Sequence, residues 1–195
     1  MLQSNQLILI ISGVAGAGKR SVAEILHQNP DKFVFSVSYT DRLPRPDETS
    51  GVEYKFVTES EFDRMVEAEE FLEWEPIHHN RYGTKKADFE NLFTTGKVVV
   101  SELDVKGMTK LRAIYPDQIV SVFVIPPSLE IAHERLTQRG TEDEADRAKR
   151  KERYSFEIAY KDQYDHIIIN DKLDRARDEL LEIIEGKLEK GKSGE

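Results

Sequence analysis

A glycine-rich segment near the N-terminus has the residue types that bind a polyphosphate. It reads GVAGAGKRS and lies between the apolar run LILII and the amphipathic run VAEILHQ. In a turn from a strand to a helix, glycines permit close backbone approaches that side chains would block. Backbone N–H groups and the positive end of the helix then surround the phosphates, and a lysine adds charge at the β and γ positions. The segment predicts an ATP-type site formed by Gly13, Val14, Ala15, Gly16, Ala17, Gly18, Lys19, Arg20 and Ser21.

The residue after the lysine departs from the usual form of this loop. The pattern G-x-x-x-x-G-K-[ST] is met from Gly13 to Lys19, but Arg20 replaces the hydroxyl that such loops keep for magnesium. Ser21 cannot simply stand in, because one step along a helix turns the side chain by about 100°. Magnesium would then depend on waters, phosphate oxygens and carboxylates from elsewhere, which this hard ion accepts. The departure bears on catalysis more than on binding.

The elements that must position this loop alternate between strands and helices. Runs rich in Val and Ile have the composition of buried parallel strands, and segments with helical spacing separate them. The alternation predicts an α/β layered fold, with a terminal helix from Leu173 to Leu188. The predicted strands are Leu7–Ile11, Val98–Val100, Val120–Ile125 and Ile167–Ile169.

Two regions do not fit the alternation. The region from about Ser36 to Leu92 has several prolines and glycines among short aromatic-rich stretches, which is typical of an inserted β-rich part. Within it, the spacing of Thr58 and Glu61 predicts a capping box at the start of a helix. The second region, Arg139–Arg153, is almost wholly polar, and such a charge run by itself indicates a solvated surface rather than a functional segment.

Composition limits the classes of function. The chain has 195 residues and a net charge of -9, which argues against sequence-independent binding of nucleic acid, because a phosphate backbone requires a basic face. It has no cysteine, which excludes disulfides and thiolate metal sites. No apolar run approaches the ~20 residues that span a bilayer, and no basic residue precedes the first apolar run. We expect a cytoplasmic protein that binds neither membranes nor nucleic acid polymers.

Several ordered motifs resemble those of guanylate kinase. The resemblance covers the chain from about Leu7 to Ile184. The motifs are SVSYTDRLPRPDETSGVEYKFV (36–57), FLEW (71–74), NRYGT (80–84), ELDVKG (102–107) and IPPSLEIAHERLTQRGTE (125–142). The resemblance implies a single domain with the P-loop kinase fold, in which helices flank a parallel five-stranded sheet. It further implies a core (1–35, 93–134 and 157–195), a small β-rich GMP-binding insert (36–92) and a helical lid (135–156).

The residues can be checked against the chemistry that the resemblance implies. A GMP phosphate requires planar bidentate donors, which arginines supply, and hydroxyls can add to them. Guanine offers two nitrogen donors and one oxygen acceptor, so carboxylates and hydroxyls read it, whereas adenine would leave those carboxylates unpaired. The implied GMP-binding residues are Arg42, Arg45, Tyr54 and Tyr82 at the phosphate, Glu73 and Asp104 at the base, and Ser38 and Thr84 near its oxygen.

Phosphoryl transfer requires in-line positioning and cations that stabilise charge on the moving group. The resemblance implies that Lys19 and Arg42 act together with three arginines of the lid. It thereby favours a closing lid for the polar run that begins at Arg139. The implied lid arginines are Arg135, Arg139 and Arg150.

Four residues depart from the family pattern. Arg20 replaces the loop hydroxyl, and Glu102 stands where an aspartate usually faces magnesium. Lys106 occupies a usual glutamine position, and Asp41 places a negative charge near the expected GMP phosphate. Glu102 and Asp104 are the candidate carboxylates for an indirectly held Mg²⁺ that accompanies ATP. Glu102 could reach the ion or pair with Arg20, and Arg20 could touch phosphate directly, which would compensate for the lost hydroxyl.

The sequence therefore predicts a kinase that transfers the γ-phosphate of ATP to GMP or dGMP. Its expected partners are these small substrates, and it is expected to be a monomer or a homodimer. Three alternatives stay open at this point. They are a catalytically weak or inactive module that binds nucleotide or a protein partner, a sensor that holds a guanine nucleotide without transfer, and a kinase with another acceptor.

Overall fold

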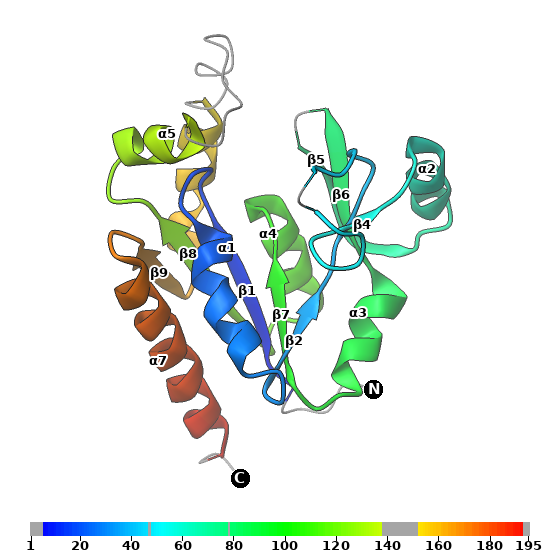
Figure 1. Ribbon diagram of the computed structural model, residues 1–195. Helices are drawn as coiled ribbons and strands as arrows, with labels where there is room; N and C mark the ends of the chain where they lie inside the picture. Colours follow the sequence, from blue (N-terminus) through cyan, green and yellow to red (C-terminus); the bar gives the residue numbers. More distant parts are fainter. Residues whose placement is uncertain (1–5, 47, 78, 138–151, 193–195) are drawn as a thin grey trace. The chain divides into compact units, whose positions relative to one another are not determined.

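The computed structural model describes residues 6–46, 48–77, 79–137 and 152–192, which form an α/β fold (Figure 1). Its larger sheet has five strands in the order β2-β7-β1-β8-β9. The ladders of β2 with β7 and of β8 with β9 are parallel, with Phe33 opposite Val98 and Val122 opposite His166. The strands are β1 (Ile8–Gly13), β2 (Phe33–Ser36), β7 (Val98–Glu102), β8 (Ile119–Ile125) and β9 (His166–Ile169).

A second sheet has four short strands in the order β4-β3-β6-β5. The strands are β3 (Tyr39–Thr40), β4 (Lys55–Phe56), β5 (Phe71–Ile77) and β6 (Asn80–Lys85). The β5–β6 pair is an antiparallel hairpin with an irregularity between Phe71 and Glu73, and β3 pairs antiparallel with β6. The β-rich character expected around residues 36–92 is therefore present.

Helices connect the strands. They are α1 (Lys19–Ala23), α2 (Glu59–Glu67), α3 (Lys86–Phe93), α4 (Val105–Ile114), α5 (Leu129–Thr137) and α7 (Leu173–Lys192), and residues 152–158 are also helical. Short 3₁₀ turns cover Glu24–Gln28 and Lys161–Gln163.

The helix after the glycine-rich loop is shorter than its amphipathic sequence indicates. Only Lys19–Ala23 is α-helical, and the chain continues as the 3₁₀ turn Glu24–Gln28. Pro30 lies just beyond, and since proline disfavours helical conformation in the residue before it, the chain tightens and stops.

The described chain falls into two compact units. One contains residues 6–8, 31–101 and 106–119, and the other contains residues 9–30, 102–105 and 120–192, apart from the gaps given above. In the first unit, Phe62 stacks on Phe71 with ring centroids 4.7 Å apart, and Phe89 stacks on Tyr115 at 5.9 Å. Each unit thus has its own aromatic or aliphatic core.

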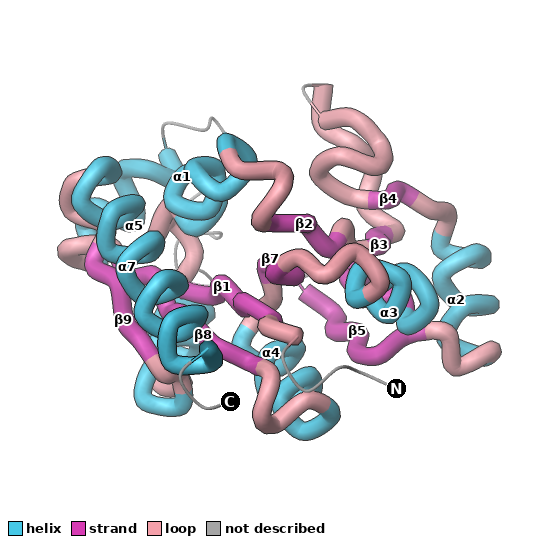
Figure 2. Tube along the Cα trace, turned by 90° about the horizontal axis from the view of Figure 1, so that it is seen from below, coloured by secondary structure: helices cyan, strands magenta, loops and turns pink. Residues whose placement is uncertain are grey.

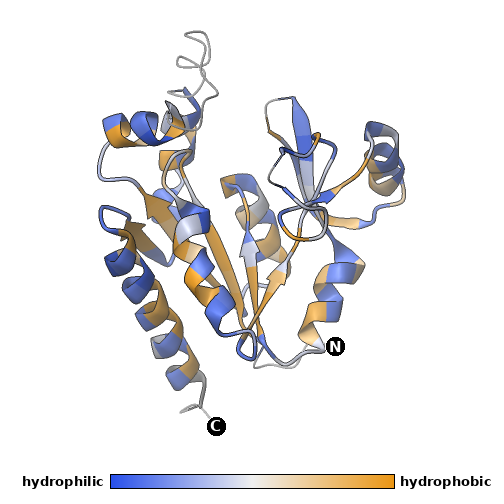
Figure 3. Ribbon diagram, viewed as in Figure 1, coloured by the Kyte–Doolittle hydropathy of each residue, from blue (hydrophilic) through white to orange (hydrophobic). Residues whose placement is uncertain are grey.

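The core of the second unit is built from apolar strands and one face of the terminal helix. β1 and β8 are mainly apolar (Figure 3), and most of their side chains are buried. In α7, Ala176, Leu180 and Ile184 are buried at helical spacing. α7 packs beside α1 (Figures 1 and 2), where Arg177 Nε donates to the Ser21 carbonyl at 3.0 Å.

The predicted fold class and the four predicted strands are confirmed, as are the terminal helix and the capping box. Thr58 Oγ1 accepts from the backbone N–H of Glu61, and the Glu61 carboxylate accepts from the backbone N–H of Thr58. The fifth strand, β2, was expected only from the family resemblance. Within the described ranges, no helix combines the length and apolar character needed to cross a membrane.

Candidate active site

The glycine-rich loop occupies residues 13–18 of the second unit, between β1 and α1, and its shape depends on its glycines. A β-carbon on Gly16 would lie 2.5 Å from the carbonyl oxygen of Ala132, and the φ of Gly16 is +80°. A β-carbon on Gly13 would lie 2.0 Å from the carbonyl oxygen of Val124. Both distances are too short for any side chain, so the backbone of β8 and α5 presses directly on the loop.

The loop is also held by side chains from later in the chain. Asn170 Nδ2 donates to the Ala17 carbonyl at 2.8 Å. Arg135 Nη2 donates to the Asn170 carbonyl at 2.9 Å, and its Nη1 lies 3.5 Å from the Ala17 carbonyl oxygen. Lys19 Nζ donates to the carbonyls of Gly13 and Val14 at 2.8 and 3.2 Å. Lys19 and Arg135, two of the predicted catalytic cations, therefore both contact the loop.

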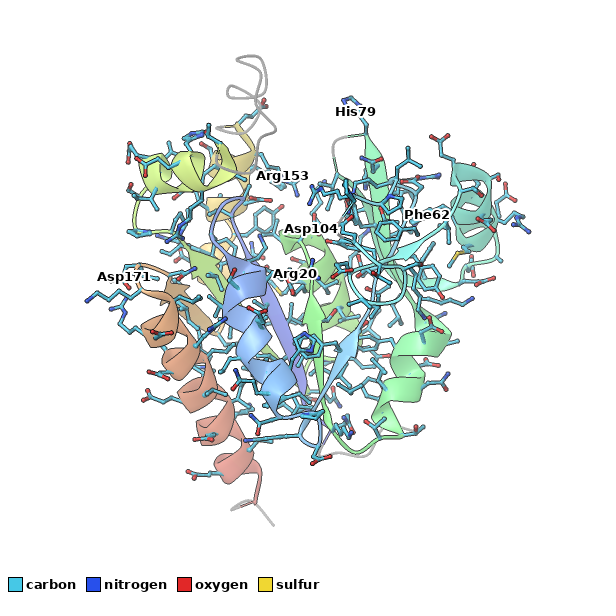
Figure 4. All side chains as sticks on the ribbon, in the orientation of Figure 1. Arg20, Phe62, His79, Asp104, Arg153 and Asp171 are labelled. Carbon is cyan, nitrogen blue, oxygen red and sulfur yellow. The ribbon has the colours of Figure 1, made fainter. Side chains whose placement is uncertain are left out.

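Glu102, the last residue of β7, carries the carboxylate expected near magnesium. Although the residue keeps solvent exposure, the protein atoms around its carboxylate raise its pKa, and the positive charges of Lys19 and Arg20 lower it by less. The net direction is a raised pKa. Glu102 therefore lies within the electrostatic reach of Arg20, as the compensation hypothesis requires; Arg20 is labelled in Figure 4.

A row of polar contacts connects the loop to Asp104. The backbone N–H of Ala15 donates to Glu157 Oε2 at 3.0 Å, and Arg153 Nε donates to Glu157 Oε1 at 2.8 Å. Arg153 Nη2 lies 3.4 Å from Asp104 Oδ2, and both residues are labelled in Figure 4. Sequence analysis did not single out Arg153, the last residue of the polar run, or Glu157, four residues beyond it, because their partners are far away in the sequence.

In the first unit, arginines and tyrosines predicted at the GMP phosphate lie together. Arg42 Nε donates to the Tyr82 hydroxyl at 3.2 Å, and the Arg42 guanidinium lies over the Tyr54 ring at 5.5 Å. The Tyr54 and Tyr82 rings meet edge to face at 5.4 Å. Arg45 approaches the same group through a carboxylate that it shares with Arg42.

That carboxylate belongs to Glu48, which sequence analysis missed. Glu48 Oε1 accepts from Arg42 Nη2 at 2.9 Å and lies 3.7 Å from Arg45 Nη1, while Glu48 Oε2 accepts from the backbone N–H of Arg45 at 2.8 Å. Partial burial raises the pKa of Glu48, but the bonds from Arg42 and Arg45 lower it by more, so the net pKa lies below the ordinary value. The two predicted phosphate arginines therefore converge on one anionic group.

The predicted guanine-reading pair lies on neighbouring strands. Glu73 of β5 is directly opposite Thr84 of β6, and Thr84 Oγ1 donates to Glu73 Oε1 at 2.5 Å. Both residues are buried. Ser38 lies just before β3, where its carbonyl accepts from the backbone N–H of Lys55 at 2.9 Å. These three residues belong to the first unit, whereas Asp104 belongs to the second.

Two of the departures from the family pattern have opposite charges beside them. Asp41 Oδ1 and Oδ2 accept from the backbone N–H and Nε of Arg81, both at 2.6 Å, so its charge is balanced by Arg81. Lys106 Nζ lies 3.7 Å from Glu75 Oε2, and Lys110 Nζ lies 2.6 Å from Glu75 Oε1. The negative charge expected to disturb the phosphate site is thus neutralised within its own unit.

Some predictions lie beyond the described ranges. Arg139 and Arg150 fall in 138–151, which the structure does not describe. Among the described residues, three or more side chains of the metal-binding types do not gather at one point. Glu102 and Asp104 remain the candidate carboxylates, and two can suffice, because Mg²⁺ is commonly held by one or two carboxylates together with phosphates and water.

Comparisons with known proteins identify the family. The family model described as "Guanylate kinase" matches residues 5–187. The chain is 38% identical over 194 residues to a guanylate kinase of Onion yellows phytoplasma, with 98% of this chain and 91% of the relative covered. It is 38% identical to a guanylate kinase of Thermotoga maritima, with 91% and 85% covered.

A solved structure agrees with this assignment. The crystal structure of guanylate kinase from Anaplasma phagocytophilum matches with a TM-score of 0.76 at 28% identity, over 96% of this chain and 88% of that chain. The chain belongs to the guanylate kinase family.

Proposed function

We propose that this protein transfers the γ-phosphoryl group of ATP to GMP or dGMP, giving ADP and GDP or dGDP. The P-loop residues 13–21 bind ATP, and the residues at the phosphate and base in the first unit bind the acceptor. Within this proposal, residues 36–92 form the GMP-binding insert, residues 135–156 form the lid, and the remainder forms the core. The cytoplasmic location and the monomeric or homodimeric state stay predictions.

The observation that carries the proposal is the arrangement of Arg42, Arg45 and Glu48. A carboxylate with one oxygen near two guanidinium groups and the other on a backbone N–H is held as a phosphate would be held. GMP brings a phosphate with more oxygens and more charge, so it can replace Glu48 or share the donors that Glu48 leaves. The Tyr54 and Tyr82 hydroxyls add donors at the same place.

The base is read by the buried Glu73, with Thr84 holding one of its oxygens. Thr84 Oγ1 donates to Glu73 Oε1, and the ionised carboxylate, which can accept several hydrogen bonds, is the acceptor for a guanine N–H. Ser38 and Thr84 are the hydroxyls for the guanine oxygen, and Asp104 is the second acceptor. An adenine base would offer these carboxylates fewer donors, and buried acceptors without partners are costly.

Transfer of the phosphoryl group depends on cationic side chains that are already in position before the reaction begins. Lys19 already bonds two loop carbonyls and can turn from them to the β and γ phosphates. Arg42 approaches the acceptor side, and Arg135, with Arg139 and Arg150 of the lid, stabilises charge on the transferred group.

Mg²⁺ enters with ATP, and the hard oxygen ligands of Glu102 and Asp104 fit it. Held there, the ion would supply positive charge that offsets the negative charge of the ATP phosphates.

A coupled ADP-release assay with ATP, Mg²⁺ and GMP tests the proposal. Turnover within an order of magnitude of the ~1–100 per second typical of kinases supports it. A Lys19→Met variant and a reaction without GMP are the matched controls. Absence of GMP-dependent release, despite calorimetric binding of GMP, would overturn it. Parallel assays with dGMP, AMP, UMP and IMP define the acceptor.

A further inference from the structure

The β5–β6 hairpin of the first unit presents a second buried carboxylate, that of Glu75, beside the residues proposed to bind GMP. Glu73 of β5 lies opposite Thr84 of β6. Two positions along the strand, Glu75 lies opposite Tyr82. Since successive side chains of a strand point to opposite faces of the sheet, these four share one face, whereas Trp74 lies on the other face with the aromatic side chains. Glu75 therefore belongs to the face that carries the base-reading pair.

Glu75 lies between the two ends of the proposed acceptor site. Glu73 and Thr84 are at the base end, and at the phosphate end the Tyr82 hydroxyl accepts from Arg42 Nε at 3.2 Å. A step of two residues along a strand covers about 7 Å. A nucleotide whose base is bound at Glu73 and whose phosphate is bound beside Tyr82 thus carries its ribose past Glu75. The sugar hydroxyl nearest the base is the 2′-hydroxyl.

The Glu75 carboxylate is held by lysines of α4. Lys110 Nζ lies 2.6 Å from Glu75 Oε1, and Lys106 Nζ lies 3.7 Å from Glu75 Oε2. Lys110 Nζ also donates to the Trp74 carbonyl at 3.0 Å, so one side chain holds both the backbone of β5 and the carboxylate that follows. The Glu75 side chain is only 10% exposed, whereas both lysine side chains are 49% exposed.

A carboxylate in this position has the chemistry to recognise a ribose. In dinucleotide-binding folds, an Asp or Glu accepts from the ribose 2′-hydroxyl. An ionised carboxylate has about four acceptor sites, so ion pairs with lysines are compatible with a further bond from a hydroxyl. A site that bonds a substrate hydroxyl disfavours the analogue that lacks it, because the buried acceptor then loses that donor. For GMP, this analogue is dGMP.

We propose that Glu75 accepts a hydrogen bond from the 2′-hydroxyl of the acceptor nucleotide and thereby makes the protein prefer GMP over dGMP. Lys110 is a positioning residue that holds the carboxylate and β5 for this contact. The inference rests on the proposed function, which places the base at Glu73 and the phosphate at Arg42, and it ranks the two acceptors of that function. It assigns Glu75 no contact with the reacting phosphates.

The ratio of kcat/KM for GMP to kcat/KM for dGMP tests the proposal. The unmodified protein should favour GMP by about tenfold or more, the effect of one hydrogen bond to a charged group. Glu75→Ala should bring the ratio close to one by lowering kcat/KM for GMP more than for dGMP. Glu75→Asp keeps the charge but withdraws it by one methylene, and it should lose most of the preference. Lys110→Met should lower the ratio by less than Glu75→Ala.

The matched control is Asp88→Asn, which removes another carboxylate that is paired with a lysine in the same unit, at 2.5 Å from Lys55 Nζ. It should leave the ratio unchanged. The proposal is overturned if the unmodified protein uses both nucleotides equally well, or if Glu75→Ala keeps the original ratio. Equal losses for both nucleotides would also overturn it, because they would give Glu75 a purely structural role.

Two further arrangements keep the test decisive. If Glu75→Ala does not fold by circular dichroism, Glu75→Asp and Lys110→Met are measured in its place, and an original ratio in both overturns the proposal. If the unmodified protein phosphorylates neither nucleotide, the proposed function fails separately. The ratio of calorimetric Kd values for GMP and dGMP then tests Glu75 with the same variants.

Discussion

Asp41 and Arg81 form a two-point pair in which Asp41 Oδ1 accepts from the backbone N–H of Arg81 and Asp41 Oδ2 accepts from its Nε, both at 2.6 Å. Arg81 also pairs with Asp63 and donates from Nη2 to the Glu59 carbonyl, and its guanidinium lies 4.6 Å from the centre of the Phe62 ring. Arg81 therefore joins β6 to α2 and, through Asp41, to the segment after β3, so the charge of Asp41 serves a structural contact.

Asp41→Asn is expected to lower stability and spare GMP binding. The Asp41 side chain is 5% exposed, so its loss leaves a half-buried guanidinium short of a partner, at a cost of about 2 kcal/mol or more. Asp63→Asn, at a side chain that is 59% exposed, should cost less than about 1 kcal/mol. Urea denaturation measures both values. Equal losses from the two variants would contradict this ranking.

Arg20 and Glu102 are expected to act as a pair. Arg20→Ser removes the cation whose charge acts on Glu102, and Glu102→Asp withdraws the carboxylate by one methylene. Each change should lower kcat/KM for ATP by about tenfold, which is ~1.4 kcal/mol of transition-state stabilisation. Together they restore the usual family residues, so the double variant should recover most of the activity.

Arg20→Lys keeps the charge and is the conservative control for this experiment. The readouts are kcat, the KM for ATP and the Mg²⁺ dependence. The hypothesis of compensation is wrong if Arg20→Ser leaves all three unchanged.

Glu48 is expected to give stability that depends on pH. Its pKa in the folded protein lies below the unfolded value of 4.5, so its carboxylate stabilises the fold above 4.5 and this contribution is lost as the pH falls through the folded-state pKa. Glu48→Gln should lower the free energy of unfolding by about 1–3 kcal/mol near neutral pH. The difference in free energy of unfolding between the unmodified protein and Glu48→Gln should shrink toward zero in acid.

Thermal melts of Glu48→Gln across this pH range provide the measurement. Glu67→Gln, at an exposed residue of α2, is the matched carboxylate control. A difference from the unmodified protein that is constant over the whole range would mean that Glu48 does not act through its charge.

Thr84→Val is expected to weaken GMP binding through Glu73. The valine has nearly the same shape but removes the donor at 2.5 Å from the buried Glu73 carboxylate. Losing a donor to a buried charge costs about 1–3 kcal/mol, so the Kd for GMP should rise about tenfold. Thr84→Ser keeps the hydroxyl and should bind nearly as the unmodified protein. Calorimetry with GMP separates the two, and equal affinities would remove Thr84 from the base-reading group.

Features with a local cause were predictable from the sequence. The spacing of glycines and lysine predicted the loop from Gly13, runs of Val and Ile predicted four of the five parallel strands, and Thr58 with Glu61 predicted a helix start. Composition did not predict β2, because this strand has only four residues, FVFS. The helix after the loop was expected to be longer, because its apolar pattern carries no signal for the 3₁₀ turn.

Ion pairs and hydrogen bonds between residues far apart in the sequence were not predictable in this way. Asp41 was read beside Arg42, its neighbour in the chain, but its charge meets Arg81 forty positions later. Arg153 ends a run whose composition fits a solvated surface, and Glu157 follows four residues later. Only the packed chain shows that Glu157 accepts from Ala15 and that Arg153 contacts Asp104. The sequence thus identifies which side chains can form ion pairs and hydrogen bonds, while the packing of the chain determines which of them are in contact.

The supports of the glycine-rich loop also bear on how the protein is made. Asn170, which holds the Ala17 carbonyl, is synthesised 153 positions after Ala17. Val124 and Ala132, whose backbone presses on Gly13 and Gly16, also come much later. A nascent chain that ends before Asn170 therefore lacks part of the frame that shapes its own nucleotide loop, and ATP is expected to assist folding only after Asn170 has been added.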